Sequence, residues 1–389
     1  MTMRDVAIIG VGMNDWGELW EDSLRGIWAE AALAALADAG VDRVDAITVG
    51  CMSGGLFVGQ EHLAALLADE IGMAGVPATR VESACASGGL ALKAGFLEVA
   101  SGQANVVLVT GVEKMTDVSG EDATAALATA ADQETEVFFG ATFPGLYAMM
   151  ARAHMARYGT TPEQLAAVAV KNHRHGLANP HAQFRRAITV EEVLASTMVA
   201  EPLHILDCSP ITDGAAAVVL ADLETARRLA HGRPLVRIAG IGHATDRIAL
   251  HSRPDMTTLP ATTAATQKAL AMAGKTITDV DVIELHDCFT IAEIMVLEAM
   301  GVCPPGQGGT LAPSGRTALG GDIPVNPSGG LKSKGHPVGA TGVAQAVEIV
   351  TQLRGEAGER QVAGARVGLT QNMGGTGAST VVHVLEVVS

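Results

Sequence analysis

The sequence is poor in aromatic and charged residues, and its basic residues are scarcer than its acidic ones. Of 389 residues, 3% are aromatic and 17% are charged, with 26 Lys and Arg against 42 Asp and Glu. The formal net charge of −16 argues against a general nucleic-acid binder and against a protein that coats anionic membranes. It still allows an anionic ligand that is held by a local basic cluster.

Cysteine is sparse as well, and its five copies form neither a disulfide nor a metal pattern. They are odd in number, widely spread, and without CxxC or Cys/His finger spacing: Cys51, Cys85, Cys208, Cys288 and Cys303. This usage predicts reduced thiols in a cytoplasmic compartment and no structural metal.

Membrane and targeting signals are also missing. Spanning a bilayer takes roughly 18–20 apolar residues, and no uninterrupted run is that long. Residues 1–12 read directly into a strand rather than a signal peptide, and the final Glu-Val-Val-Ser is not a peroxisomal tripeptide. We therefore expect a cytoplasmic protein with no membrane partner.

The first part of the chain alternates between short apolar runs and helical periodicity. Strands are predicted at 6–11, 46–49, 79–81 and 106–110, and helices at 23–39, 63–71 and about 85–101. Such alternation is typical of a mostly parallel sheet covered by helices, which places the protein in the α/β class. The pattern breaks at 113–206 and resumes as a strand at 214–220, so we interpret 113–206 as a large functional loop excursion.

The second part of the chain repeats the first. Ala37-Asp38-Ala39-Gly40 and the strand at 44–47 recur as Ala271-Met272-Ala273-Gly274 and a strand at 280–283. The strand at 106–111 likewise has a counterpart at 367–372. We predict two duplicated halves, 1–230 and 231–389, with a shared crevice at their strand ends.

The segment Glu82-Ser83-Ala84-Cys85-Ala86-Ser87-Gly88-Gly89 joins a strand to a helix of small residues. A helix N-terminus favours thiolate over thiol, and its free N–H groups stabilise an oxyanion. A buried structural cysteine is the alternative interpretation, but the flanking small residues favour Cys85 as a nucleophile.

A second glycine-rich run, from Asn326 through Gly335-His336-Pro337 to Gly342, precedes another small-residue helix. A neutral His336 held there could take a proton from a thiol, although an ordinary loop with a solvated histidine is equally compatible with this run.

Two further segments follow buried strands. His286-Asp287-Cys288-Phe289 places two titratable groups and a cysteine at one strand end, which fits acid–base chemistry better than zinc, because no further ligands are evident. The run Thr370 to Gly377 ends a strand in glycines that let the backbone approach a ligand.

Taken in order, these four segments resemble the thiolase family over nearly the whole chain. The His-Asp-Cys-Phe segment resembles the thiolases of sterol carrier protein x and the archaeal acetoacetyl-CoA thiolases. Larger groups of thiolases carry Asn-Glu-Ala-Phe there and a second catalytic cysteine in the final turn, where this chain has Asn372-Met373-Gly374. The resemblance implies a layered α-β-α-β-α thiolase fold.

The resemblance also implies roles for individual residues. Cys85 would carry the acyl group after His336 deprotonates it, and Cys288 would remove the methyl proton of a second acetyl-CoA. His286 and His336 would share the enolate oxygen. The final turn around Asn372, through the N–H of Gly374 together with that of Cys85, would hold the tetrahedral oxyanion.

Coenzyme A would then be a substrate and product, with no tightly bound cofactor. Its phosphates need basic groups, and the candidates are Arg174, His175, Arg185 and Lys332. The resemblance further implies a homodimer or tetramer, and allows a small partner protein with an OB fold and a zinc ribbon.

Four alternatives can be weighed against the sequence, and the first two remain open. A thiolase-like carbon–carbon lyase and an aromatic C-acyltransferase share the fold, but retention of Cys85 with His336 favours acyl transfer. The His-Asp-Cys segment argues against a ketoacyl synthase. A non-catalytic lipid-binding scaffold would have no reason to keep the full set of catalytic residues.

Overall fold

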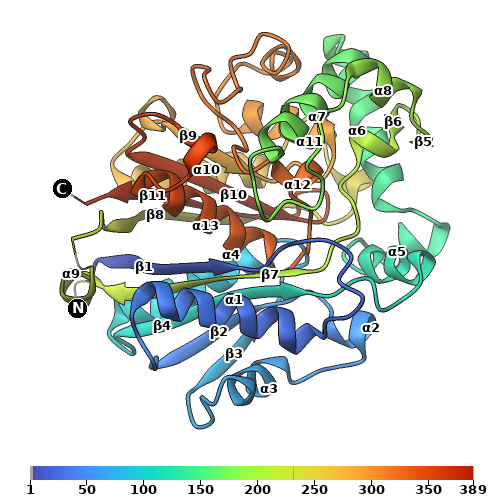
Figure 1. Ribbon diagram of the computed structural model, residues 1–389. Helices are drawn as coiled ribbons and strands as arrows, with labels where there is room; N and C mark the ends of the chain where they lie inside the picture. Colours follow the sequence, from blue (N-terminus) through green and yellow to red (C-terminus); the bar gives the residue numbers. More distant parts are fainter. Residues whose placement is uncertain (1–2, 231, 389) are drawn as a thin grey trace.

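The computed structural model describes residues 3–230 and 232–388, which form one large mixed sheet, a small ribbon and covering helices (Figure 1). The large sheet contains β1 (Val6–Met13), β2 (Ala46–Gly50), β3 (Ala78–Val81), β4 (Val106–Glu113), β7 (Gly214–Asp222), β8 (Val236–Thr245), β9 (Val282–Leu285), β10 (Val367–Gly374) and β11 (Ser379–Val387). The ribbon pairs β5 (Met198–Ala200) with β6 (Leu203–His204).

The α-helices are α1 (Leu24–Ala39), α2 (Gly54–Val58), α3 (Leu63–Glu70), α4 (Ser87–Ser101), α5 (Gly120–Ala128), α6 (Phe143–Tyr158), α7 (Pro162–Gly176), α8 (Val190–Ala195), α9 (Leu223–Leu229), α10 (Pro260–Ala273), α11 (Thr290–Ala299), α12 (Gly330–Ser333) and α13 (Thr341–Arg354). Short 3₁₀ helices are η1 (Val137–Phe139), η2 (Ile205–Asp207), η3 (Leu250–Ser252), η4 (Ile277–Asp279), η5 (Gly308–Thr310) and η6 (Gly358–Arg360).

The two halves of the sheet have the same topology. In the first half, β4 lies parallel to β2 and antiparallel to β7, and β7 pairs with β1. In the second, β10 lies parallel to β9 and antiparallel to β11, and β11 pairs with β8. An isolated bridge from Ile283 to Val325 takes the place of the pairing between β2 and β3. The repeated segments of the sequence therefore occupy equivalent positions, while the division at 230/231 stays a prediction.

Paired glycines explain why each half places its first helix so close to its first strand. A Cβ on Gly10 or Gly12 of β1 would overlap backbone oxygens of α1, and a Cβ on Gly240 or Gly242 of β8 would overlap those of α10. Only glycine allows this approach. The G-x-G pair in each strand is thus a second signature of the duplication.

Helices α4 and α13 form a central layer between the two halves of the sheet. Their apolar side chains share one core with residues of both halves, including Val109 and Val218 on one side and Val282 and Leu385 on the other. Helices α1 and α3 cover the outer face of the first half, and α10 covers that of the second. The halves join directly where Ala7 and Ile8 pair with β8. The predicted α-β-α-β-α layering is confirmed.

The excursion at 113–206 forms a cap of helices over one side of the sheet, at the right of Figure 1. Helix α6 packs Leu146, Tyr147 and Met150 into the same core as α11 and β9. The helices of the excursion thus cover the region above the strand ends. Among the residues that the structure describes, none of the helices is both long and apolar enough to cross a membrane.

Candidate active site

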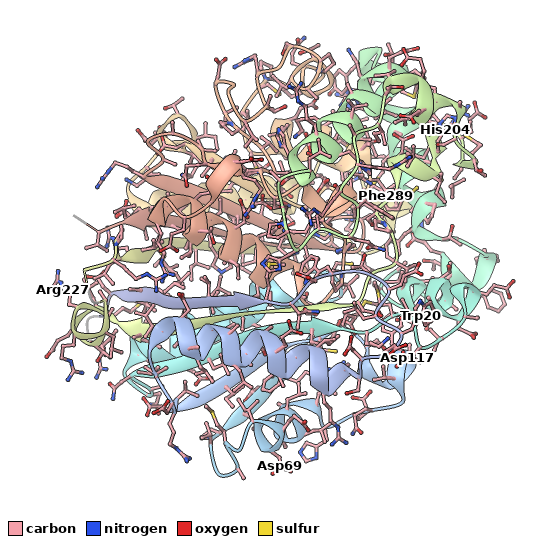
Figure 2. All side chains as sticks on the ribbon, in the orientation of Figure 1. Trp20, Asp69, Asp117, His204, Arg227 and Phe289 are labelled. Atoms are coloured by element: carbon pink, nitrogen blue, oxygen red, sulfur yellow. The ribbon has the colours of Figure 1, made fainter. Side chains whose placement is uncertain are left out.

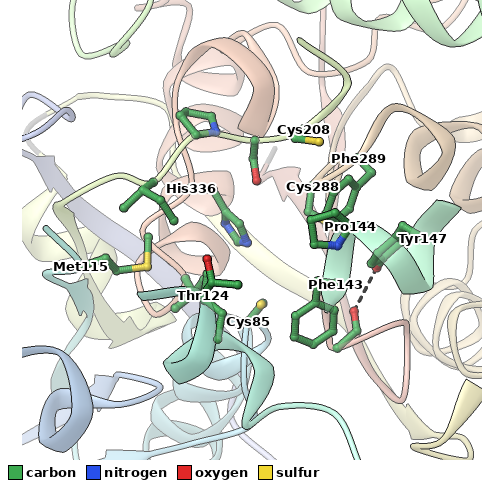
Figure 3. A pocket seen from close by; sticks show the side chains of 16 residues that line it. Cys85, Met115, Thr124, Phe143, Pro144, Tyr147, Cys208, Cys288, Phe289 and His336 are labelled. Atoms are coloured by element: carbon green, nitrogen blue, oxygen red, sulfur yellow. Dashed lines mark hydrogen bonds between the residues drawn. The ribbon is translucent and has the colours of Figure 1, made fainter. Parts of the chain in front are cut away.

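The four segments singled out in the sequence meet at the carboxyl ends of the strands. Cys85 lies between β3 and α4, His286 and Cys288 lie between β9 and α11, and His336 lies between α12 and α13. One potential ligand atom from each of Cys85, His286 and His336 lies within 4.8 Å of the others. Figure 3 shows Cys85, Cys288 and His336 around one pocket. Three such donors could also hold Zn²⁺, so the predicted absence of a metal stays a prediction.

Cys85 sits on a tight turn rather than at the first residue of a helix. Ala84 adopts a left-handed φ of 50°, and α4 begins only at Ser87. The Ser87 hydroxyl holds the turn, because it accepts from the Ser83 N–H at 2.9 Å and donates to the Ala84 carbonyl at 2.6 Å. The expected helix start at Cys85 is therefore two residues too early. The turn still points the thiol into the pocket.

The dipole of a helix N-terminus, which favours a thiolate, is not the main influence on Cys85. Burial raises the pKa of the Cys85 thiol, the neighbouring Cys288 adds to that rise, and the backbone N–H of Gly375 opposes it. Desolvation therefore outweighs the favourable dipoles at this turn. The thiol must lose its proton to a base during the reaction.

His336 is placed to be that base. Its Nδ1 lies 2.7 Å from the Thr341 hydroxyl, which donates to the Pro337 carbonyl at 3.0 Å and so accepts from the imidazole. The proton of the neutral ring is then on Nδ1, and Nε2 keeps its lone pair. Burial lowers the pKa of His336 well below the usual range, with His286 and nearby lysines adding to the effect.

The side chains of the His-Asp-Cys segment point in two directions, toward the site and away from it. His286 is fully buried and meets His336 edge-on, with ring centroids 4.8 Å apart. Cys288 lines the pocket, whereas Asp287 turns away and accepts from the Leu331 N–H and the Asn172 amide, both at 2.8 Å. Burial, with Glu293 nearby, raises the pKa of Asp287 to about 6. Asp287 therefore supports the fold of the site.

Cys288 has an environment that partly offsets its burial. Burial raises the pKa of its thiol to about 12, while hydrogen bonding by Tyr147 and the charge of Lys332 lower it. The Tyr147 hydroxyl donates its single proton to the Gly375 carbonyl at 2.9 Å (Figure 3), and its ring stacks on Phe289 with centroids 4.5 Å apart. Tyr147 thus connects Cys288 to the glycine turn that faces Cys85.

The pocket is small and mostly apolar. It encloses about 150 Å³ and is lined by Phe143, Tyr147 and Phe289 among others. Sequence reasoning missed Tyr147, Gly375 and Cys208, all of which reach this pocket. Gly375, one residue beyond the predicted Gly374, has its N–H near Cys85. Gly374 packs under the turn, since a Cβ there would lie 2.5 Å from the Ser83 carbonyl oxygen.

Two of the four predicted phosphate ligands are in the wrong place. Lys332 is 1% exposed, and its ammonium donates to the carbonyls of Asp207 at 2.6 Å and Cys288 at 2.9 Å. His175 is 3% exposed and contacts the Asn326 carbonyl. Neither can reach a phosphate in solvent. Arg174 and Arg185 are exposed and stay predictions.

Comparison with known proteins gives matches over the whole chain. Residues 6–224 match the family described as "Thiolase, N-terminal domain", and residues 242–387 match "Thiolase C-terminal domain-like". The chain is 54% identical to an acetyl-CoA acetyltransferase of Methanothermobacter thermautotrophicus, over 98% of this chain and 99% of that one. It is 38% identical to sterol carrier protein 2 of Gallus gallus, over 97% of this chain and 71% of that one.

Solved structures agree with the fold. An Ltp2–ChsH2(DUF35) aldolase superposes with a TM-score of 0.83 at 27% identity, covering 99% of this chain and 98% of that one. Human mitochondrial 3-ketoacyl-CoA thiolase in complex with CoA gives a TM-score of 0.76 at 19% identity, with full coverage of both chains.

Proposed function

Because the chain belongs to the thiolase family and is a thiolase-type acyltransferase, we propose that it condenses acetyl-CoA with an acyl-CoA, reversibly, through an acyl thioester on Cys85. The observation that carries this proposal is the cluster of Cys85, His286 and His336 at the strand ends. The 54% identical acetyl-CoA acetyltransferase supports acetyl-CoA as a substrate. A pocket of about 150 Å³ favours short acyl groups, since a cavity of that size holds a molecule no larger than about benzene.

The first stage is transfer of the acyl group to Cys85. His336 accepts the thiol proton at Nε2, and the Cys85 sulfur attacks the thioester carbonyl of the acyl-CoA. The N–H groups of Cys85 and Gly375 are placed to bind the tetrahedral oxyanion. The carbon–sulfur bond to CoA breaks, and the departing CoA thiolate takes a proton from Cys288. An acyl-Cys85, an imidazolium at His336 and a thiolate at Cys288 remain.

The second stage forms the carbon–carbon bond. The Cys288 thiolate removes a methyl proton from a second acetyl-CoA, and His286 with protonated His336 donates to the enolate oxygen. The enolate carbon attacks the acyl carbonyl, and the bond to the Cys85 sulfur breaks. Cys85 recovers its proton from His336, so every group returns to its starting state.

Product analysis tests the proposed reaction. Purified protein mixed with acetoacetyl-CoA and CoA should yield two acetyl-CoA per substrate consumed, and removing CoA should stop the reaction. A carbon–carbon lyase is the second candidate, favoured by the likeness to the Ltp2–ChsH2(DUF35) aldolase. It would instead split a hydroxylated acyl-CoA without free CoA. That result, together with no CoA-dependent cleavage, would overturn the acyltransferase mechanism.

We expect the acylation rate to persist at acidic pH, because the lowered pKa keeps His336 neutral. For a base with an ordinary histidine pKa of about 6.5, the neutral fraction falls about thirtyfold from pH 7.5 to pH 5. The rate of acetyl-Cys85 formation, measured by rapid quench and mass spectrometry, should fall far less over that interval. Circular dichroism at each pH serves as the folding control. A thirtyfold fall in folded protein would show that His336 titrates normally.

Arg174 and Arg185 are proposed to contact the phosphates of CoA from the surface. They lie on neighbouring segments, since His173 next to Arg174 contacts the Arg186 carbonyl at 3.2 Å. Replacing both by alanine should raise KM for acetyl-CoA about two- to fivefold per arginine and leave kcat unchanged, as expected for exposed charges. A pantetheine thioester without these phosphates should show no change.

The matched control for this pair is Arg227→Ala. Figure 2 places Arg227 at the edge of the molecule, far from Phe289 in the pocket, and its side chain is equally exposed. An unchanged KM in the Arg174/Arg185 double variant, or an equal rise in the control, would remove both arginines from the CoA site.

Assembly and location are further proposals. We propose a homodimer or tetramer in the cytoplasm, where the five free cysteines would stay reduced. A small OB-fold and zinc-ribbon partner is also proposed, supported by the DUF35 component named in the neighbouring aldolase. Gel filtration with light scattering, alone and after co-purification, tests both.

A further inference from the structure

The buried amide of Asn372 contacts three separate parts of the site. Asn372 is 1% exposed near the end of β10. Its Oδ1 accepts from the Gly89 N–H in α4 at 3.1 Å. Its Nδ2 donates to the Cys85 carbonyl at 2.9 Å and lies 3.1 Å from Nδ1 of His286. One side chain therefore links the nucleophile turn to the histidine that follows β9.

These contacts leave the amide only one orientation. A backbone N–H can only donate, so the atom facing Gly89 must be the oxygen, and the atom facing the Cys85 carbonyl must be the nitrogen. The amide nitrogen has no lone pair to offer, which means that Nδ1 of His286 must accept. The proton of the neutral His286 ring is consequently on Nε2.

The other side of His286 is free to act. Its Nε2 is buried and has no hydrogen-bond partner among the residues that the structure describes. Burial lowers the pKa of His286 to about 3, so the ring stays neutral. A buried donor without a partner is costly unless a ligand satisfies it. A ring nitrogen of His286 lies within 4.8 Å of the Cys85 sulfur and of a ring nitrogen of His336, and both of these residues line the pocket.

We propose that Asn372 is a positioning residue that holds the proton of His286 on Nε2, so that this imidazole donates to the oxygen of the bound acetyl-CoA. Thr341 holds the resting His336 in the opposite tautomer, with its lone pair on Nε2. The two neighbouring neutral histidines therefore have different roles: His336 accepts a proton, and His286 donates a hydrogen bond. This inference rests on the proposed condensation, and it assigns Asn372 a task in the second stage only.

The wild-type protein gives the most direct test. Nitrogen-15 NMR of histidine-labelled protein should show the His286 proton on Nε2, with the resonance assigned by its loss in His286→Ala. A proton on Nδ1 would overturn the proposal whatever the activity of the enzyme, and this readout does not depend on the proposed reaction.

Asn372→Asp changes the hydrogen bonding while nearly preserving the shape. The carboxylate still accepts from the Gly89 N–H but now accepts from His286, so the ring proton moves to Nδ1 and Nε2 loses its donor. We expect condensation to slow about 10²–10³-fold, as for loss of one oxyanion donor. Acetyl-Cys85 formation should also slow, but by less than condensation, because a carboxylate oxygen would face the Cys85 carbonyl oxygen where the amide now donates a hydrogen bond.

A double-mutant cycle separates a positioning role from a merely structural one. If Asn372 acts through His286, Asn372→Asp should cause no further loss of condensation in the His286→Ala background. Additive losses, or an unchanged tautomer in Asn372→Asp, would contradict the proposal. Should Asn372→Asp not fold, the wild-type tautomer still decides the matter. Loss of acetyl-Cys85 formation in wild type would instead count against the proposed function itself.

Discussion

Replacing Cys85 by alanine is expected to abolish acyl transfer, with the steady-state rate falling at least about 10⁴-fold. The reason is covalent: the acyl chain is bonded to the Cys85 sulfur in the proposed intermediate, and alanine has no atom that could form this bond. The measurement is CoA-dependent cleavage of acetoacetyl-CoA by the purified variant. Thermal unfolding should change little, because alanine keeps the turn and loses only the sulfur.

Cys303→Ala is the matched control for that variant. Cys303 is also a buried free thiol, but it lies in the core beyond α11 and does not line the pocket. Its activity should equal that of wild type. Substantial activity in Cys85→Ala, or an equal loss in Cys303→Ala, would show that Cys85 is not the acyl carrier.

The second large effect is expected for Cys288→Ala, which should separate the two stages of the reaction. Acetyl-Cys85 should still form, although more slowly, because His336 and the oxyanion donors are intact and the departing CoA thiolate can take its proton from solvent. Condensation should slow about 10²–10⁴-fold, the usual contribution of a positioned acid or base. Exchange of the acetyl-CoA methyl protons with deuterated solvent, followed by NMR, should be lost as well.

Tyr147→Phe is a milder variant to compare with Cys288→Ala, because it keeps the Cys288 thiol. The Tyr147 hydroxyl lowers the pKa of the Cys288 thiol, so its loss should impair proton exchange without removing the sulfur. Normal methyl exchange in Cys288→Ala would assign the base to another residue. Failure of Cys288→Ala to acylate Cys85 would show that the first stage cannot proceed without Cys288, contrary to this expectation.

Local patterns predicted the fold well, and they singled out segments that the structure brings close together. Strand and helix periodicity, together with the repeat of 37–47 at 271–283, located the two halves that the sheet pairing displays. The cysteine turn follows β3 and the His-Asp-Cys segment follows β9, so both lie at strand ends, where ligands bind in α/β sheets. The Gly-His-Pro loop lies between α12 and α13, and tertiary packing brings it to the same place.

The errors concern properties that depend on tertiary packing. Lys332 reads as a surface cation because it is a lysine in a glycine-rich loop, but α7 and α12 pack together and bury it. The same packing buries His175. Tyr147 was missed because α6 enters the site from the distant excursion. The sequence showed the helix dipole near Cys85 but not the desolvation by burial, which raises the pKa of its thiol.

Intact-protein mass spectrometry after mixing with acetyl-CoA tests the central claim most directly. We predict an acetyl adduct on wild type and on Cys288→Ala, and none on Cys85→Ala. The adduct should disappear when free CoA is added, because the first stage is reversible. A wild-type protein that forms no adduct with acetyl-CoA or with longer acyl-CoA donors would contradict an acyl-Cys85 intermediate.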